Sequence, residues 1–304
     1  DYLAVLCAAQ SLTFSCAHPA PAQHVSDTPC ATHAVTIASD SFDAARILAL
    51  AGRCPMVLSM GNAEMCGGHF DQMGGAQEES LWRHSSLPCS LWPLRAFDED
   101  DEDPRLFPCL PDFTLPGHPY LTRSKQPAYP LGEAGGIYSR NVVVLRDGKG
   151  RALPKAECFC CSVVTAAAQD LRDGTPFRAD VARQTLRTVL HAGARWGHDA
   201  LVLGALGCGI FENPSEAVAG LWYQLLVEEF AGHFHEVVFA VYAGQTRVSE
   251  GMPMKSKAFH DFAKVFGMCE DLPAWMETEE ARKALPSNSI RTLDAPVSSR
   301  CVIC

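Results

Sequence analysis

The sequence lacks any uninterrupted run of about 18 apolar residues, the length that a transmembrane helix requires. It also lacks a basic excess, since 25 Lys and Arg stand against 35 Asp and Glu, giving a formal net charge of −10. A surface of this charge does not attract nucleic acid through its overall field, so any anionic ligand must be held locally by backbone N–H groups and helix N-termini. We therefore expect no transmembrane segment and no nucleic-acid partner.

No two CxxC units lie at the short separation that zinc sites use, and no HxxxH unit is present. The 14 cysteines are scattered through apolar runs such as residues 158–164. That distribution favours buried free thiols in a reducing compartment over a disulfide scaffold. We expect no metal ion, no cofactor and a cytoplasmic or nuclear location. The last four residues, 301–304, match the C-a-a-X prenylation pattern only loosely.

Hydrophobic residues make up 47% of the chain, which is enough for one large core. Residues 1–32 show no lasting periodicity, and we expect them to form an N-terminal arm. A single catalytic domain is expected over residues 33–269, with an acidic loop insertion near 95–130, and a tail over 270–304. We expect the protein to be a monomer.

Apolar patterns predict strands and helices in alternation. The expected strands are residues 34–38, 55–60, 141–146, 158–165, 200–204 and 237–242. The expected helices are 42–50 with Ser41 as N-cap, a helix starting near 77, 175–196 and 214–234. Strands that alternate with long helices indicate an α/β sheet covered by helices on both faces.

Two glycine-rich loops each follow a predicted strand, at the sheet edge where open α/β folds bind ligands. The first, residues 61–76, leads directly into the adjacent carboxylates Glu78 and Glu79. Spacing alone fits either an active site or an acidic first turn that complements a helix dipole. The second, residues 204–214, contains three glycines that suit a phosphate cradle or simply a tight turn. The G-K-[ST] ending of a nucleotide triphosphatase loop is absent.

Taken together, these motifs resemble the microbial-type poly(ADP-ribose) glycohydrolases, which are catalytic members of the macrodomain fold. In that family a glycine triplet precedes Gln-Glu-Glu, and here Gly67-Gly68-His69-Phe70 precedes Gln77-Glu78-Glu79. Residues 40–45, 137–139 and 165–167 are also similar, so the resemblance covers roughly residues 34–245. It implies an α/β fold, a macrodomain-like three-layer α/β/α sandwich with a mixed central sheet.

The resemblance also implies a pocket for one ADP-ribose unit, whose expected contacts can be assigned residue by residue. Asp40 would lie beside the adenine, and the backbone of Gly207, Cys208, Gly209 and Ile210 would hold the diphosphate. Phe211, Asn62 and Gln77 would position the distal ribose, with Gly67, Gly68 and His69 in close backbone contact with the substrate. Glu79 would act as general acid and then as general base, and Glu78 would bind the ribose hydroxyls or the leaving group.

These residue types suit cleavage at C1″ of ribose, because an oxocarbenium-like transition state needs a proton for the leaving group and negative charge nearby. The function that the resemblance implies is hydrolysis of the ribose–ribose O-glycosidic bonds of poly(ADP-ribose), with release of ADP-ribose. Two departures, His69 at the third glycine and Ser59 where an asparagine is expected, leave the substrate open. His69 could narrow the site, contact another leaving group or point to solvent. The alternatives are a hydrolase of ADP-ribosyl-arginine on proteins and a non-catalytic ADP-ribose reader.

Overall fold

The computed structural model describes residues 10–15, 30–72, 75–91, 128–243, 246–249, 252–254, 256–278 and 285. Most of the expected acidic insertion and the C-terminal residues 301–304 lie outside these ranges. None of the helices in the described ranges is long and apolar enough to cross a bilayer.

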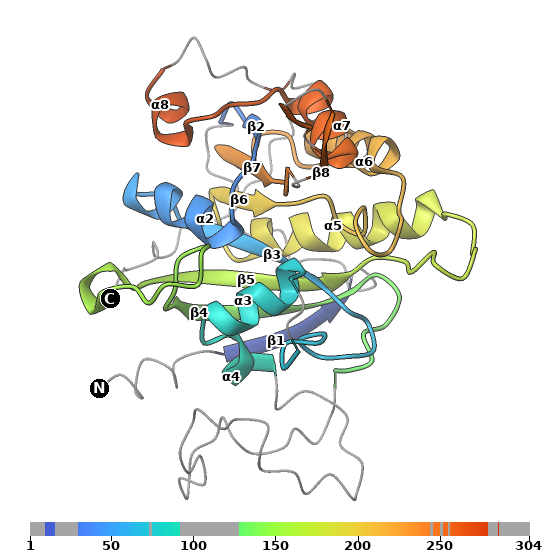
Figure 1. Ribbon diagram of the computed structural model, residues 1–304, viewed down its shortest axis with the longest axis horizontal. Coiled ribbons are helices and arrows are strands. Elements are labelled where there is room, and N and C mark those ends of the chain that lie inside the picture. Colours follow the sequence, from blue (N-terminus) through green and yellow to red (C-terminus); the bar gives the residue numbers. More distant parts are fainter. Residues whose placement is uncertain are drawn as a thin grey trace, which may run out of the picture.

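A seven-stranded mixed sheet forms the centre of the fold, in the order β1-β4-β5-β3-β6-β7-β2 (Figure 1). Its strands are β1 (Gln10–Ser15), β2 (His33–Ile37), β3 (Pro55–Gly61), β4 (Gly135–Val144), β5 (Phe159–Ala167), β6 (Ala200–Leu203) and β7 (Glu236–Ala240). The strands from β5 to β2 in this order pair in parallel, whereas β4 is antiparallel to both β5 and β1. The carboxyl ends of the parallel strands therefore meet at one edge, where ligands bind in such sheets.

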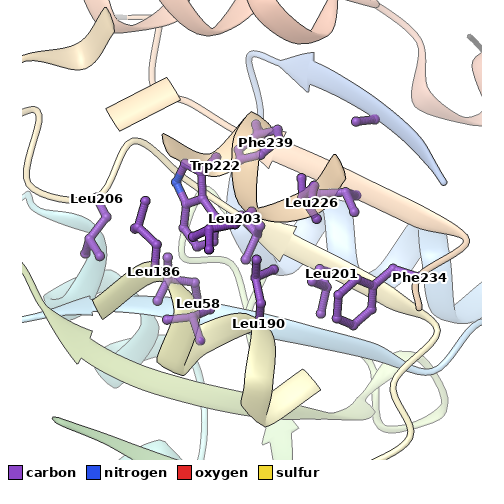
Figure 2. Close-up of a cluster of buried hydrophobic side chains, with 14 of the residues drawn as sticks. Leu58, Leu186, Leu190, Leu201, Leu203, Leu206, Trp222, Leu226, Phe234 and Phe239 are labelled. Atoms are coloured by element: carbon purple, nitrogen blue, oxygen red, sulfur yellow. The ribbon is translucent and has the colours of Figure 1, made fainter. Parts of the chain in front are cut away.

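Helices cover both faces of the sheet, and the expected α/β/α sandwich is confirmed. The helices are α2 (Ser41–Leu50), α3 (Gln77–His84), α4 (Leu87–Leu91), α5 (Ala179–Arg195), α6 (Ser215–Glu228), α7 (Lys257–Phe266) and α8 (Leu272–Glu277). A 3-10 turn (Lys155–Glu157) and a hairpin of β8 (Thr246–Ser249) and β9 (Met252–Met254) complete the described elements. The helices α5, α6 and α7 bury one core cluster, and α2, α3, α4 and α8 bury the other. Figure 2 shows the first cluster, in which Leu190 and Trp222 pack around Leu203.

The folded domain extends past both boundaries that the sequence suggested. Within the expected arm, Gln10–Ser15 forms β1 and pairs with β4, so this part of the prediction is wrong. The pairing covers backbone groups of β4 that would otherwise form an open sheet edge. Within the expected tail, α8 buries Leu272 and Trp275 in the core beside α2.

The start of α2 also differs from its prediction, because Asp40 rather than Ser41 is the N-cap. Oδ1 of Asp40 accepts hydrogen bonds from the backbone N–H groups of Phe42 (2.8 Å) and Asp43 (3.3 Å). Ser41 is the first helical residue, and its hydroxyl accepts a hydrogen bond from Gln77. Asp40 is therefore fixed at the ligand-binding edge by the helix that it caps.

Candidate active site

The two glutamates lie in the first turn of α3, yet they do not face solvent as a simple dipole-complementing pair would. Glu78 is 3% exposed and Glu79 is 8% exposed. Their side chains lie against the glycine-rich loop that links β3 to α3. Charged groups are buried in this way only where specific partners hold them.

Glu78 is held by the backbone of that loop. Oε2 accepts a hydrogen bond from the N–H group of Asn62 (2.8 Å), and Oε1 accepts one from Gly67 (3.0 Å). Burial raises the pKa of Glu78 to about 8, and the adjacent charge of Glu79 adds to the shift, against the lowering effect of the two N–H groups. Glu78 therefore keeps its proton near neutral pH.

Only one of the two carboxyl oxygens of Glu79 accepts a hydrogen bond from the described residues. Oε1 accepts a hydrogen bond from the N–H group of His69 (3.1 Å), whereas Oε2 is buried without a partner among the described residues. A buried carboxyl oxygen without a hydrogen-bond partner is costly unless a ligand supplies one. The geometry suits an acid that meets its hydrogen-bond partner only when a substrate is bound.

Both preserved glycines of the triplet are required by the packing. Gly68 has φ +56°, and a Cβ there would lie 2.5 Å from Oε1 of Glu79. Gly67 has φ +81°, and its Cβ would lie 2.5 Å from the ring of Trp82. At the third position, His69 is exposed and contributes its backbone N–H group to Glu79. The second departure, Ser59, is fully buried within β3 and does not line the cleft that the two loops share.

Gln77 ties three elements together. Its Oε1 accepts a hydrogen bond from the N–H group of Met60 (2.9 Å), and its Nε2 donates to the carbonyl of Leu58 (2.7 Å) and the hydroxyl of Ser41 (3.1 Å). Both amide hydrogens are thus used within the protein, and only a lone pair on Oε1 is left for the expected ribose contact.

Asn62 and Asp40 each retain polar atoms for a ligand. Oδ1 of Asn62 accepts hydrogen bonds from the N–H groups of Glu64 and Met65, and its Nδ2 hydrogens have no acceptor among the described residues. Oδ1 of Asp40 caps α2, Oδ2 has no donor within the same described ranges, and burial raises the pKa of this carboxyl. An amide donor and a carboxylate acceptor thus lie at separate strands of the same edge.

The second loop, residues 204–214, presents backbone N–H donors, as its glycines suggested. Not all of the residues expected to contact a diphosphate have a free N–H group. In the described part of the chain, the N–H groups of Gly209, Ile210 and Phe211 have no acceptor. The N–H group of Cys208 donates to the carbonyl of Ala205 (3.0 Å) and is used within the turn, so the expected contact of this residue with a diphosphate stays a prediction. This hydrogen bond of the Cys208 N–H group lies within the turn and stabilises its conformation.

Asn213 holds this loop in place and was missed by the sequence analysis. Its Nδ2 donates to the carbonyls of Gln169 (2.7 Å) and Phe211 (3.1 Å). Gly207 has φ +75°, and a Cβ there would lie 2.7 Å from Asn213 Nδ2. The only local signal for Asn213 was the presence of an asparagine within the glycine-rich loop of residues 204–214.

The sequence analysis also missed Arg172, whose guanidinium lies 5.3 Å from the ring centroid of Phe211.

The two loops share one cleft of about 440 Å³. Asn62 from the first loop and Phe211 from the second both line it, together with residues that precede β4 and follow β5. Within the described ranges, no three His, Cys, Asp or Glu side chains converge in a way that could hold a metal ion. The cleft thus brings the loop that holds the glutamates together with the loop that presents the N–H donors.

Comparisons with known proteins agree with this geometry. A family model described as the microbial-type PARG catalytic domain matches residues 6–147, which include Asp40 and the first loop. The poly(ADP-ribose) glycohydrolase of Thermomonospora curvata, bound to the inhibitor ADP-HPD, is 31% identical, with 77% of this chain and 78% of that chain covered and a TM-score of 0.56. This chain belongs to the microbial-type poly(ADP-ribose) glycohydrolase family.

Two further structures of the family align over more of the chain. A second T. curvata structure is 28% identical, covering 87% of this chain and 88% of that one, with a TM-score of 0.61. The Deinococcus radiodurans enzyme, in complex with ADP-ribose, is 26% identical, covering 86% of this chain and 95% of that one, with a TM-score of 0.61. No curated protein sequence matches. The family expected from the motifs is confirmed.

The pKa of Glu78 has a consequence for stability. A carboxyl whose pKa is raised on folding stabilises the fold below its unfolded pKa of 4.5, and this contribution is lost as the pH rises to about 8. We expect Glu78→Gln to lack that loss. Its free energy of unfolding relative to the unchanged protein should rise between pH 5 and pH 8, by up to about 4 kcal/mol over these three pH units, at about 1.4 kcal/mol per unit.

Denaturant titrations at several pH values measure this difference. The glutamine of the variant faces one of the two N–H partners with its NH₂ group, which adds a constant offset, so the slope with pH is the informative quantity. Parallel stability curves for the two proteins would show that Glu78 is ionised in the folded state.

Proposed function

We propose that this chain is an ADP-ribosyl glycohydrolase that cleaves the ribose–ribose O-glycosidic bonds of poly(ADP-ribose) and releases ADP-ribose. The observation that carries the proposal is the buried, unpartnered Oε2 of Glu79, under the loop whose first residues line the cleft. A reader that only binds ADP-ribose has no use for a carboxyl group with a buried, unpartnered oxygen at this position.

The strand order suggests how one ADP-ribose unit lies along the edge of the sheet. The diphosphate is placed at β6, where the N–H groups of Gly209, Ile210 and Phe211 are available. The adenine lies toward β7 and β2, between Oδ2 of Asp40 and the ring of Tyr242, which is 79% exposed just after β7. The distal ribose lies at the end of β3, beside Asn62 and the glutamates.

The reaction then follows from the two carboxyls. Glu79 gives its proton to the oxygen that leaves C1″, the C1″–O bond breaks, and the positive charge spreads over C1″ and the ring oxygen. Water attacks C1″ while Glu79 takes back a proton, so the enzyme is regenerated. Glu78, neutral near pH 7, can donate its proton in a hydrogen bond to a ribose hydroxyl without adding a second negative charge.

The setting of the enzyme remains part of the proposal. The described cysteines are all free thiols, which suits a reducing compartment such as the cytoplasm or the nucleus. We propose that the protein acts there as a monomer, without nucleic acid. The high acidic content supports the latter point.

An activity panel tests the function. The full chain is incubated with poly(ADP-ribose), and separately with a protein carrying single arginine-linked ADP-ribose units. We expect ADP-ribose to be released from the polymer, and calorimetry to show binding of free ADP-ribose. Release from arginine alone would make the enzyme a mono-ADP-ribosyl hydrolase, and binding without release from either substrate would make it a reader.

A further inference from the structure

Two cysteines lie at the edge of the sheet opposite to the ligand cleft. Cys54 directly precedes β3, and Cys160 follows the first residue of β5, so both lie at the amino ends of parallel strands. The two strands are neighbours in the sheet (Figure 1). No step of the proposed reaction uses either cysteine.

The register of the two strands brings these cysteines opposite each other. Met56 of β3 pairs with Ser162 of β5. Continued back by two residues, the same register places Cys54 beside Cys160, and adjacent strands lie about 4.8 Å apart. A disulfide joins residues whose Cα atoms are about 4.4–6.8 Å apart, so the two positions are within its reach.

Side-chain contacts and the alternation of side chains along a strand place both cysteines on the same face of the sheet. The Cys54 sulfur lies 3.5 Å from Nδ1 of His198, whose Nε2 lies 2.7 Å from the Tyr138 hydroxyl. That hydroxyl in turn lies 2.9 Å from Oγ of Ser162. Cys160 shares the face of Ser162, because the two are separated by one residue in β5. The side chains of Cys54 and Cys160 therefore project to the same side, as a disulfide requires.

His198 supplies the Cys54 sulfur with a hydrogen-bond donor. Burial lowers the pKa of His198 to about 4, so near neutral pH the ring is uncharged and only one of its nitrogens carries a hydrogen. Nδ1 lies 3.0 Å from the carbonyl oxygen of Cys54, which can only accept, so the hydrogen is on Nδ1. The same N–H group lies beside the Cys54 sulfur and stabilises negative charge on it while it reacts.

Solvent access separates this pair from the cysteines next to it. Cys160 is exposed and Cys54 is partly buried. Cys161 is buried in the core on the other face of the sheet, and burial raises the pKa of its thiol. Cys158 is partly buried, and its thiol lies 3.6 Å from the carbonyl oxygen of Pro154. Among the three cysteines of residues 158–161, Cys160 is therefore the one that an oxidant in solution reaches most easily.

We propose that Cys54 and Cys160 form a modification site, a thiol pair that hydrogen peroxide oxidises to a disulfide. The Cys160 sulfur attacks one oxygen of the peroxide, the O–O bond breaks, and the other oxygen leaves as water with the thiol proton, which gives a sulfenic acid. The Cys54 sulfur then attacks the Cys160 sulfur, the S–O bond breaks, and a second water leaves with the Cys54 proton. The two sulfurs together lose two electrons, and the peroxide takes them up.

The disulfide also changes the stability of the fold. It joins β3 to β5 and closes a loop of about 100 residues, which restricts the unfolded chain. We expect the melting temperature of the oxidised protein to rise by about 5 °C or more, and dithiothreitol to reverse the rise.

The experiment treats the full chain with hydrogen peroxide near neutral pH and blocks the remaining thiols with iodoacetamide under denaturing conditions. Mass spectrometry of the unreduced digest then maps the linked cysteines, and thermal melts follow the stability. The variants are Cys54→Ser and Cys160→Ser, with Cys158→Ser as the matched control from the same end of β5. We expect the link between Cys54 and Cys160, and the rise in melting temperature, in the unchanged protein and in Cys158→Ser. Neither should occur in the other two variants.

Two results in the unchanged protein would overturn the pair. One is a link that joins other cysteines, and the other is oxidation of Cys160 to the sulfinic acid while Cys54 stays a thiol. An equal rise in melting temperature in oxidised Cys54→Ser would also overturn it, because the stabilisation would then not come from this link. None of these measurements uses catalysis, so their outcome is independent of the proposed function.

Discussion

Replacing Glu79 with glutamine should lower kcat/KM on poly(ADP-ribose) by about 10²- to 10⁴-fold, the range typical of a lost general acid. Glutamine keeps the size of the side chain, and its Oε1 can still accept the hydrogen bond from the His69 N–H group. It cannot transfer a proton to the leaving oxygen. Binding of ADP-ribose, measured by calorimetry, should change only a few-fold, because the contacts proposed for the diphosphate and the adenine lie on β6, β7 and β2.

The matched control is Glu277→Gln, which removes the same charge from an exposed position on α8. It should leave kcat, KM and ADP-ribose affinity unchanged. Turnover that survives in Glu79→Gln would move the acid to another residue, with Glu78 the first candidate because it keeps its proton near neutral pH. Loss of binding together with turnover would mean that Glu79 mainly shapes the pocket.

Local patterns predicted most strands and helices, and they failed where a side chain or a backbone irregularity breaks the pattern. The strand β4 was expected at 141–146 but spans Gly135–Val144. Its register shifts between Ser139 and Val142, and Asn141 has φ +54°, so the alternation restarts inside one strand. The apolar pattern of α6 was extended to Phe234, although the helix ends at Glu228. Phe234 belongs to the loop that follows α6, and its side chain is fully buried in the core. Its apolar character therefore reflects burial and does not indicate a longer helix.

The part of the candidate site that depends on glycine conformation could be predicted from the sequence. Gly67 and Gly68 were identified because only glycine tolerates these conformations and contacts, and the structure supplies both reasons. The choice between a dipole-complementing pair and an active-site pair could not be made from spacing, because Glu78 and Glu79 occupy the first helical turn in either case. Burial and the N–H groups of residues 62, 67 and 69 argue against an exposed dipole-complementing pair and support the proposed active-site role.

Contacts that join distant segments had no sequence signal. Asn213 bonds to Gln169, 44 residues away, and nothing in the local pattern pairs these two positions. The same holds for Gln77, whose amide is shared among Leu58, Met60 and Ser41. Sequence motifs indicated which loops are expected to bind a ligand, whereas the rigidity of those loops comes from tertiary hydrogen bonds that only the fold reveals.

Gly68→Ala should lower kcat/KM on the polymer about 100-fold, the effect of misplacing a catalytic group by about 1 Å. The added methyl group would lie 2.5 Å from Oε1 of Glu79 and 3.2 Å from Oε2 of Glu78. Because the ends of flexible side chains can move, the clash displaces the carboxylates rather than unfolding the loop. Alanine at φ +56° also strains the backbone by about 1–2 kcal/mol.

Two further glycines separate these effects. Gly52 has φ +77° with open space around its Cβ, so Gly52→Ala measures the strain alone and should lower the melting temperature without changing kcat/KM. Gly75 lies in the same loop as Gly68, with open space and no left-handed φ, so Gly75→Ala should change neither quantity. If Gly68→Ala only loses stability, as Gly52→Ala does, then Glu79 tolerates displacement and its position under the glycine loop is not what makes it a catalyst. If activity falls while stability follows Gly52→Ala, the close contact between Gly68 and the carboxylate is what holds the acid in place.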